Sequence, residues 1–513
     1  MAQIKDSSHW MNCQLFFTPP DVELREILEI AAEIYNANPE IEAAILSDQQ
    51  DAALAKRELR DADEAWRRTR EREAAPTLFQ LPNKQKSSRR ALGTGCPRMP
   101  AVLVFVLLLC RGRWGSVTDQ PAQERLQDSK TLDVFLHAHD IRLPARSTIH
   151  ENINVVSEET LNLILTAEMR LACDEGLDDF SRYFLDSTGV TANSRWPTDS
   201  GSLSRALHRA FHYGQKLGLF GLPTFRKFTM PRELRRIRRL DYKINTKAGK
   251  PHSQEEVEKL YGELMEVGDQ LMYKLRSELE WVRTQYEPEQ LPPSTRIQCE
   301  AVLKQIAGDC LDADILICNI DDRVFENEKL KDWQRIPSLS DRSAAFICKG
   351  DRVPIVGYRP QLVRSGNGLV VHLNTPEGNA ADSGQLVDCI DAAVRRTDCG
   401  PNEVSVDDGY CSAAGREALQ ELGIDVVSIS GSKGKRLTPP SEWESPKYKK
   451  SRNDRSAVES LMFSLKDTVD FGYVRRRGIA AVRCELLEKV IAYNLAKLVV
   501  LRKRKENQLN KAA

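Results

Sequence analysis

The chain has 513 residues, of which 41% are hydrophobic and 29% charged, with 74 basic and 74 acidic side chains. This composition is ordinary for a globular protein, and the length allows two or three domains. None of the 12 cysteines forms a C-x-x-C pair, which argues against a zinc site and for reduced thiols. The apolar run 101–110 has about half the length that spans a bilayer, so we expect a buried helix or strand and no membrane partner.

The first 175 residues predict mostly helices. Residues 1–75 form an acidic helical region, in which Leu24, Ile27, Ile30 and Ile34 recur at helical spacing. Residues 76–122 contain the apolar run but follow neither the helical nor the strand period, and we interpret them as a linker or a degenerate segment. Residues 123–175 predict short helices joined by tight turns, a pattern found in DNA-binding modules, and we expect a helical DNA-binding region here.

Residues 176–200 predict a strand block, with Asp186 inside the strand. Residues 201–344 predict a long helical region. One helix in it has an apolar seam with spacings of three and four, which favours packing within its own domain over a dimer zipper; the seam is Val257, Leu260, Leu264, Val267, Leu271 and Leu275. Just before it lies an arginine-rich stretch, and arginine at this density suits phosphate contact; it includes Arg235, Arg236, Arg238 and Arg239.

Residues 345–505 predict alternating strands and helices, and residues 506–513 a short tail. Strands are expected at 345–348, 353–358, 369–373, 403–406 and 425–429, with helices at 383–396, 413–422, 455–466 and 479–502. The last helix ends in the basic run Arg502 to Lys505, which we expect to add to DNA affinity.

Three carboxylates occupy positions that suit a metal site. Asp186 lies in an early strand, Asp407 ends a short buried strand, and Glu459 lies on a late helix. Two-metal phosphoryl transfer needs several oxygen ligands on rigid elements. At 100° per residue, Arg455, Glu459 and Lys466 fall within about 40° of one another on a helix, opposite an apolar face. A surface helix with a salt-bridged polar face would give the same pattern.

The spacing Arg455-x3-Glu459-x6-Lys466 resembles the motif around the catalytic glutamate of bacterial insertion-sequence transposases of the DDE class. The family's fuller motif has Tyr at the position of Arg452. Three further segments resemble blocks of this family. LDSTGVTANSRWPTDSG looks like the first-aspartate block, and GYRPQLVRSGNGLVVHLNTPEGNAADSGQL looks like the strand hairpin that follows it. VDDGYCS looks like the second-aspartate block, D-x-G-Y. The D-x-G-Y pattern selects Asp407 over Asp408. The resemblance covers about residues 125–505.

The resemblance implies an α/β RNase H-like catalytic core, in segments 176–200 and 345–505, with 201–344 as a large helical insertion and an N-terminal all-α region. Asp186, Asp407 and Glu459 would bind two Mg²⁺ ions, with Mn²⁺ as a substitute. They would catalyse cleavage at the terminal inverted repeats of an insertion sequence and strand transfer into target DNA. Arg455 and Lys466 would contact backbone phosphates. A homodimer on DNA and a cytoplasmic, nucleoid-associated location follow from the same resemblance.

Three alternatives stay open: a catalytically dead DNA-binding relic of a transposase, an RNase H-like nuclease without strand transfer, and a helical scaffold protein. The last leaves the α/β blocks unexplained. Trp196 and Trp281 are candidates for stacking on a flipped base, although core packing is the favoured interpretation of both.

Overall fold

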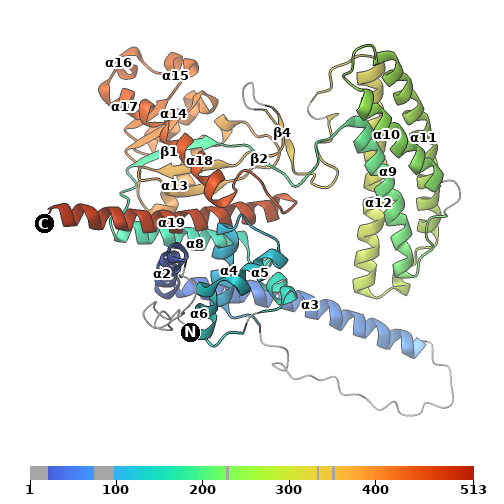
Figure 1. The fold of residues 1–513 in the computed structure, drawn as a ribbon, viewed down its shortest axis with the longest axis horizontal. Coiled ribbons are helices and arrows are strands. Elements are labelled where there is room, and N and C mark those ends of the chain that lie inside the picture. The colour runs from blue at the N-terminus through green and yellow to red at the C-terminus, as the bar shows by residue number, and fades with distance from the viewer. Residues whose placement is uncertain are drawn as a thin grey trace. The chain divides into compact units, whose positions relative to one another are not determined.

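The computed structural model describes residues 21–73, 98–142, 144–226, 230–331, 334–348 and 353–512 (Figure 1). The chain divides into two compact units. The first contains the described residues within 1–52, 95–193 and 343–513, and the second those within 53–94 and 194–342.

A five-stranded mixed sheet forms the centre of the first unit. Its order is β6-β5-β1-β7-β8, in which β1 runs antiparallel to β5 and parallel to β7. The strands span Arg182–Ser187 (β1), Gln361–Ser365 (β5), Val370–Asn374 (β6), Glu403–Val406 (β7) and Val426–Ile429 (β8). The predicted strands at 369–373, 403–406 and 425–429 are confirmed, whereas β5 was expected only as part of a hairpin.

A small second sheet, of order β2-β4-β3, continues from the end of β1. Its strands are Val190–Thr191 (β2), Ala345–Ile347 (β3) and Ile355–Tyr358 (β4), so two predicted strands are confirmed here. Gly357 in β4 packs so closely against β2 that a Cβ atom would overlap the carbonyl oxygen of Val190. The close approach explains why this strand position carries no side chain.

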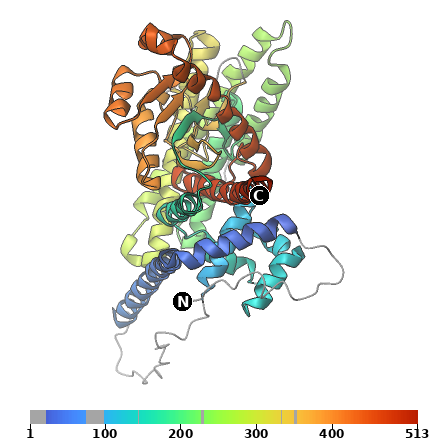
Figure 2. The ribbon, with the colours of Figure 1, turned by 90° about the vertical axis from the view of Figure 1, so that its left-hand side faces the viewer.

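Helices pack around the sheet of the first unit. Helices α13 and α19 contact β6, α17 contacts β7 and β8, and α18 contacts β1. Figures 1 and 2 both show the long α19 lying beside α8 and α4. These helices and their neighbours span Glu158–Asp174 (α8), Leu386–Thr397 (α13), Ala413–Glu421 (α14), Ser432–Leu437 (α15), Pro440–Trp443 (α16), Pro446–Asp454 (α17), Ala457–Val469 (α18) and Ile479–Ala512 (α19).

The apolar run forms helix α4, Ala101–Arg113, in the middle of the N-terminal helices. Every residue from Ala101 to Gly112 is buried, and α4 packs against α19. The expectation of a buried helix or strand for the apolar run is confirmed, and the element is a helix. A helix that is apolar on all sides has no amphipathic period, which is why periodicity alone did not choose between helix and strand. The linker interpretation of residues 76–122 is therefore wrong for residues 101–113, while residues 76–97 lie outside the described residues. Among the described helices, none combines the length and apolar character needed to cross a membrane.

Four shorter helices and one long one complete this N-terminal region. They span Val22–Ala37 (α2), Pro39–Glu73 (α3), Asp119–Asp128 (α5), Lys130–Ala138 (α6) and Arg146–Ile153 (α7). Helix α3 begins directly after α2, because Asn38 closes α2 and Pro39 suits the first position of a new helix.

A buried ion pair joins α4 to α19. Arg111 is only 3% exposed and donates to both oxygens of Glu488, at 3.0 and 2.6 Å, and to Asn154 at 2.9 Å. Arg476 binds the same carboxylate at 2.6 Å. Bidentate pairs of this kind fix the relative position of two elements, so α4 is fitted to α19 by specific contacts as well as by apolar burial.

Replacing Gly112 with Ala is expected to destabilise the first unit by roughly 1–3 kcal/mol, because the new Cβ atom would overlap the backbone carbonyl of Glu488. Urea unfolding followed by fluorescence measures the loss. Gly308→Ala in the second unit is the matched control, since its Cβ atom would meet nothing within 4 Å. A Gly112→Ala protein as stable as the parent would show that α4 does not pack here.

The basic run at the end of α19 is engaged by acidic groups of the first unit. Arg502 binds Glu175 at 2.8 Å and Glu33 at 3.1 Å, and Lys503 binds Glu26 at 2.6 Å. Glu26 and Glu33 belong to the acidic helix α2. These ion pairs neutralise much of the charge that was expected to attract DNA.

The second unit is built on four long helices: Asp199–Lys216 (α9), Met230–Lys247 (α10), Gln254–Thr284 (α11) and Pro293–Ile320 (α12). Its core includes Leu264, Leu271 and Leu275 of the predicted seam, each fully buried. The seam therefore packs within its own unit, as its spacing favoured, and is not an exposed zipper face.

Candidate active site

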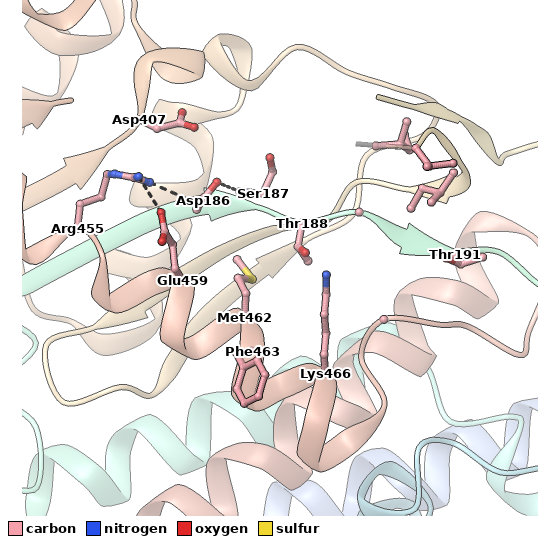
Figure 3. A pocket seen from close by; sticks show the side chains of 15 residues that line it. Asp186, Ser187, Thr188, Thr191, Asp407, Arg455, Glu459, Met462, Phe463 and Lys466 are labelled. Carbon is pink, nitrogen blue, oxygen red and sulfur yellow. Dashed lines mark hydrogen bonds and ion pairs between the residues drawn. The ribbon is translucent and has the colours of Figure 1, made fainter. Parts of the chain in front are cut away.

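All five residues predicted around the reaction centre line one pocket of about 620 Å³ in the first unit. These are Asp186, Asp407, Arg455, Glu459 and Lys466 (Figure 3). Asp186 comes from β1, Asp407 follows β7, and Glu459 and Lys466 lie on α18. Lys466 points toward Thr188, at the other end of the pocket from Asp407.

The two aspartates are neighbours because their strands are paired. In the parallel ladder of β1 and β7, Phe184 lies opposite Ser405. Continuing that register by two residues brings Asp186 beside Asp407, and since side chains alternate along a strand, both point to the same side of the sheet. Asp186 is 5% exposed, and its side chain accepts the backbone N–H of Ser187 at 2.7 Å.

Arg455 bridges two of the three carboxylates. Its guanidinium lies 3.6 Å from Asp186 and 3.1 Å from Glu459 (Figure 3). The predicted helix 455–466 is wrong at its start, because α18 begins at Ala457 and Arg455 follows α17. The short connection lets the arginine reach back across the pocket, while Glu459 and Lys466 share one face of α18.

The donor set fits a divalent cation, because three carboxylates from a strand, a strand end and a helix face one pocket. Within the described residues, however, no three acidic, histidine or cysteine side chains lie close enough to hold a metal ion as they stand. The Arg455 guanidinium supplies the positive charge between Asp186 and Glu459. Cation binding by all three carboxylates would require Arg455 to leave that position.

The structure separates the two adjacent aspartates of the D-x-G-Y block. Asp408 accepts the backbone N–H groups of Lys433 and Gly434 at 3.0 and 2.9 Å and so caps α15. Burial acts to raise the pKa of Asp408, but these hydrogen bonds and one from Ser432 outweigh it and lower that pKa. Asp407 lines the pocket and accepts the N–H of Gly409 at 2.9 Å. Of the two, Asp407 is the one that lines the pocket, and its role as a metal ligand stays a prediction.

A polar network supports the aspartates from behind. Arg359 donates to Ser187 Oγ at 3.1 Å and pairs with Asp382, which is 6% exposed. Asp382 also accepts Gln361 Nε2 at 3.0 Å, and Gln361 accepts the hydroxyl of Tyr410. The network runs from the residue after Asp186 to the loop that carries Asp407.

The chemistry of this network depends on a neutral Tyr410. Burial, followed by the negative charges of Asp382, Asp186 and Asp407, raises the pKa of Tyr410, so its hydroxyl stays protonated and donates to Gln361. Position 409 requires glycine, because a Cβ atom there would lie 2.8 Å from the carboxylate of Asp382 and 3.0 Å from that of Asp407. Sequence reasoning missed Arg359 and Asp382 as site residues, although both lie in the hairpin block that resembles the family.

Replacing Asp382 with Asn is expected to lower the metal-dependent cleavage that the resemblance implies by roughly 10- to 100-fold, the usual effect of removing a group that positions metal ligands. The substitution keeps the side-chain size but removes the charge opposite Arg359. Activity measured against metal concentration should show a higher half-saturation point. Asp391→Asn, on α13 and paired with Arg395, is the control. If Asp382→Asn and Asp391→Asn reach half-maximal activity at the same metal concentration, Asp382 does not position the metal ligands.

Comparison with known families assigns the segment that carries most of this site. Residues 332–495 match the family model described as transposase DDE domain. The chain carries a DDE-class transposase domain. The match includes Asp382, Asp407, Arg455, Glu459 and Lys466, while Asp186 precedes it. No curated protein and no solved structure matches the chain.

The other basic residues predicted to bind DNA lie on α10, outside the transposase domain. Arg235, Arg236, Arg238 and Arg239 are all exposed. Arg235, Arg236 and Arg239 line a groove of about 750 Å³ together with Arg232 and Lys243, at helical spacing along one side of α10. Arg238 is outside this groove. Arg452, which replaces the family's Tyr, lies 4.1 Å over the ring of Trp443.

Proposed function

We propose that this chain is a DDE transposase that cleaves DNA at the ends of an insertion sequence and transfers the resulting strand to target DNA. The observation that supports the proposal most is the convergence of Asp186, Asp407 and Glu459 on one pocket with Arg455 and Lys466. The transposase DDE domain at 332–495 supports the reaction class. The three carboxylates would be the catalytic, metal-binding residues.

We further propose that the first unit contains an RNase H-like core. Three antiparallel strands, β1, β5 and β6, are followed in the chain by two strands parallel to β1, and β1 is central. Residues 194–342 of the second unit would then be an insertion between β2 and β3. Strand ends of such a sheet hold their side chains rigidly, which suits groups that must keep fixed distances during phosphoryl transfer.

The chain's own residues would bind and orient the DNA strand. Asp186, Asp407 and Glu459 would hold Mg²⁺, or Mn²⁺ in its place, and the two cations would supply Lewis-acid chemistry and activation of the attacking hydroxyl. Arg455 would move from Asp186 to a backbone phosphate beside the scissile bond. Lys466, at the other end of the same face of α18, would hold a second phosphate.

We also propose that the α10 groove binds the DNA backbone. Replacing Arg235 and Arg239 together with Ala should flatten the plot of log binding constant against log salt concentration, by about 0.9 for each phosphate that these side chains neutralise. Fluorescence anisotropy at several salt concentrations gives the slope. Lys304→Ala, an exposed cation on α12, serves as the control. An unchanged slope in the double variant would exclude the groove.

Strand joining distinguishes a transposase from a nuclease of the same fold. A pre-cleaved terminal inverted repeat from the DNA flanking this gene is incubated with the protein, divalent metal and a target plasmid. A covalent product that joins the repeat's 3′ end to the plasmid is expected. Cleavage without joining would favour the nuclease, and binding without cleavage the relic. A protein with this role would act as a homodimer on paired ends and be located with the nucleoid in the cytoplasm.

A further inference from the structure

Two cysteine thiols meet where the end of helix α8 lies beside the turn that follows α13. Cys173 is on the last turn of α8, and Cys399 is two residues after the end of α13. The two thiols are hydrogen-bonding neighbours. Cys173 is exposed and Cys399 is half-buried, so a small molecule can reach the pair from solution.

Contacts between the two helices hold this part of the first unit together. Helix α8 packs against α13. Arg396, near the end of α13, donates to Thr166 Oγ1 at 3.2 Å and also binds the side chain of Asn162, and both partners lie on α8. These hydrogen bonds join the two helices one to two turns before α8 reaches Cys173.

The turn that carries Cys399 is fixed to the central sheet. Asp398 has a φ angle of 53°, in the left-handed region, and closes α13. The backbone N–H of Cys399 donates to Thr397 Oγ1 at 3.3 Å, and the same hydroxyl is hydrogen-bonded to that of Tyr183 at 2.8 Å. Tyr183 is a fully buried residue of β1. The backbone at Cys399 is therefore anchored, which keeps its thiol beside Cys173.

The two cysteines differ in how readily they react. The thiolate is the reactive form of a cysteine. Burial, followed by the neighbouring Cys173 thiol, raises the pKa of Cys399 and so lowers its thiolate fraction. The more exposed Cys173 is therefore expected to react first with a reagent from solution, and Cys399 second. Two thiols that already point at each other need only a small approach of their sulfur atoms to form a disulfide.

We propose that Cys173 and Cys399 are a redox pair, which low-molecular-weight disulfides such as oxidised glutathione convert into a disulfide that clamps α8 to the turn before β7. The Cys173 thiolate attacks one sulfur of oxidised glutathione, so that a mixed disulfide forms and one glutathione thiolate leaves. Cys399 then loses its proton to solvent and attacks the Cys173 sulfur, and the second glutathione thiolate leaves.

The reaction oxidises two protein thiols and reduces one glutathione disulfide to two thiols, so an excess of reduced glutathione reverses it. Neither cysteine lines the candidate active site, and the clamp is therefore independent of the proposed function. The bond would close a long loop, because β1, β5 and β6 lie between the two cysteines in the chain. A disulfide that closes a long loop restricts the unfolded chain and so stabilises the folded protein.

Mass spectrometry of the full-length protein in a glutathione redox buffer tests the pair. Wild type, Cys173→Ser and Cys399→Ser are quenched with N-ethylmaleimide and digested without a reductant. Wild type should yield two peptides linked through Cys173 and Cys399, and an excess of reduced glutathione should separate them. The glutathione adduct at Cys173 should be at least about tenfold more abundant in Cys399→Ser than in wild type, because a neighbouring thiol displaces glutathione at high effective concentration. Cys318, an exposed cysteine on α12, is the internal control and should carry the same amount of adduct in both proteins.

Thermal unfolding of the same samples tests the clamp. Oxidised wild type should melt a few degrees above the reduced protein, and Cys173→Ser should show no such difference. Equal amounts of adduct at Cys173 in wild type and Cys399→Ser, with no linked peptides, would overturn the redox pair. A linked wild-type protein that melts at the temperature of the reduced protein would overturn the clamp.

Discussion

Replacing Glu459 with Gln should lower strand cleavage by at least about 1,000-fold, equivalent to roughly 4 kcal/mol of transition-state stabilisation. The amide keeps the size of the side chain but cannot provide the negative charge that a divalent cation requires. DNA binding should change little, because Arg455 and Lys466 remain. The measurement is the rate of release of the labelled repeat end at saturating metal, alongside the dissociation constant for the same DNA.

Asp467→Asn is the matched control for Glu459→Gln. Asp467 lies on the same helix and is exposed, but it does not line the pocket. The Asp467→Asn variant should cleave DNA at the wild-type rate. Retained cleavage in Glu459→Gln would show that the glutamate is not a metal ligand, whereas loss of cleavage in both variants would point to damage to α18.

Exchanging each aspartate of the D-x-G-Y block for Asn should give opposite results. Asp407→Asn removes a charge that faces the pocket, and cleavage should again fall by about 1,000-fold or more. Asp408→Asn keeps a side-chain oxygen that can accept the backbone N–H groups of Lys433 and Gly434, and Asn caps a helix nearly as well as Asp. The cleavage rate of Asp408→Asn should therefore fall by less than about tenfold.

The same pair of variants can be compared by thermal unfolding. Neither should lower the melting temperature by more than a few degrees, since a cap contributes about 1 kcal/mol. An active Asp407→Asn protein beside an inactive, folded Asp408→Asn protein would reverse the assignment of the metal ligand.

The sequence predicted the site best where local pattern and chemistry coincide. Short apolar runs that end in an acidic residue placed Asp186 and Asp407 at strands, and the apolar period of residues 455–466 placed Glu459 on the outer face of a helix. The strands next to them, β6, β7 and β8, were predicted within one residue. In these segments, secondary structure alone determines which way the side chains point.

Features that depend on tertiary contacts were missed. The apolar run was expected to be buried, but its packing against α19 was not predicted, because Glu488, the partner of Arg111, lies 377 residues away. Arg359 precedes β5 and Asp382 follows β6, so both approach the site only when the hairpin of β5 and β6 folds onto β1. The basic ending of α19 suggested DNA, but folding brings it to the acidic α2. Residue type alone cannot distinguish a charge that is paired within the protein from one that awaits a ligand.

The central claim is tested most directly by cleavage of the terminal inverted repeats that flank this gene. Labelled repeat DNA is incubated with the full-length protein in Mg²⁺, in Mn²⁺ and in EDTA, beside an Asp186→Asn variant shown to be folded. We predict nicking at the repeat end in both metals, none in EDTA and none by the variant. A folded wild-type protein that binds the repeat without cutting it, or cutting that survives Asp186→Asn, would contradict the proposed active site.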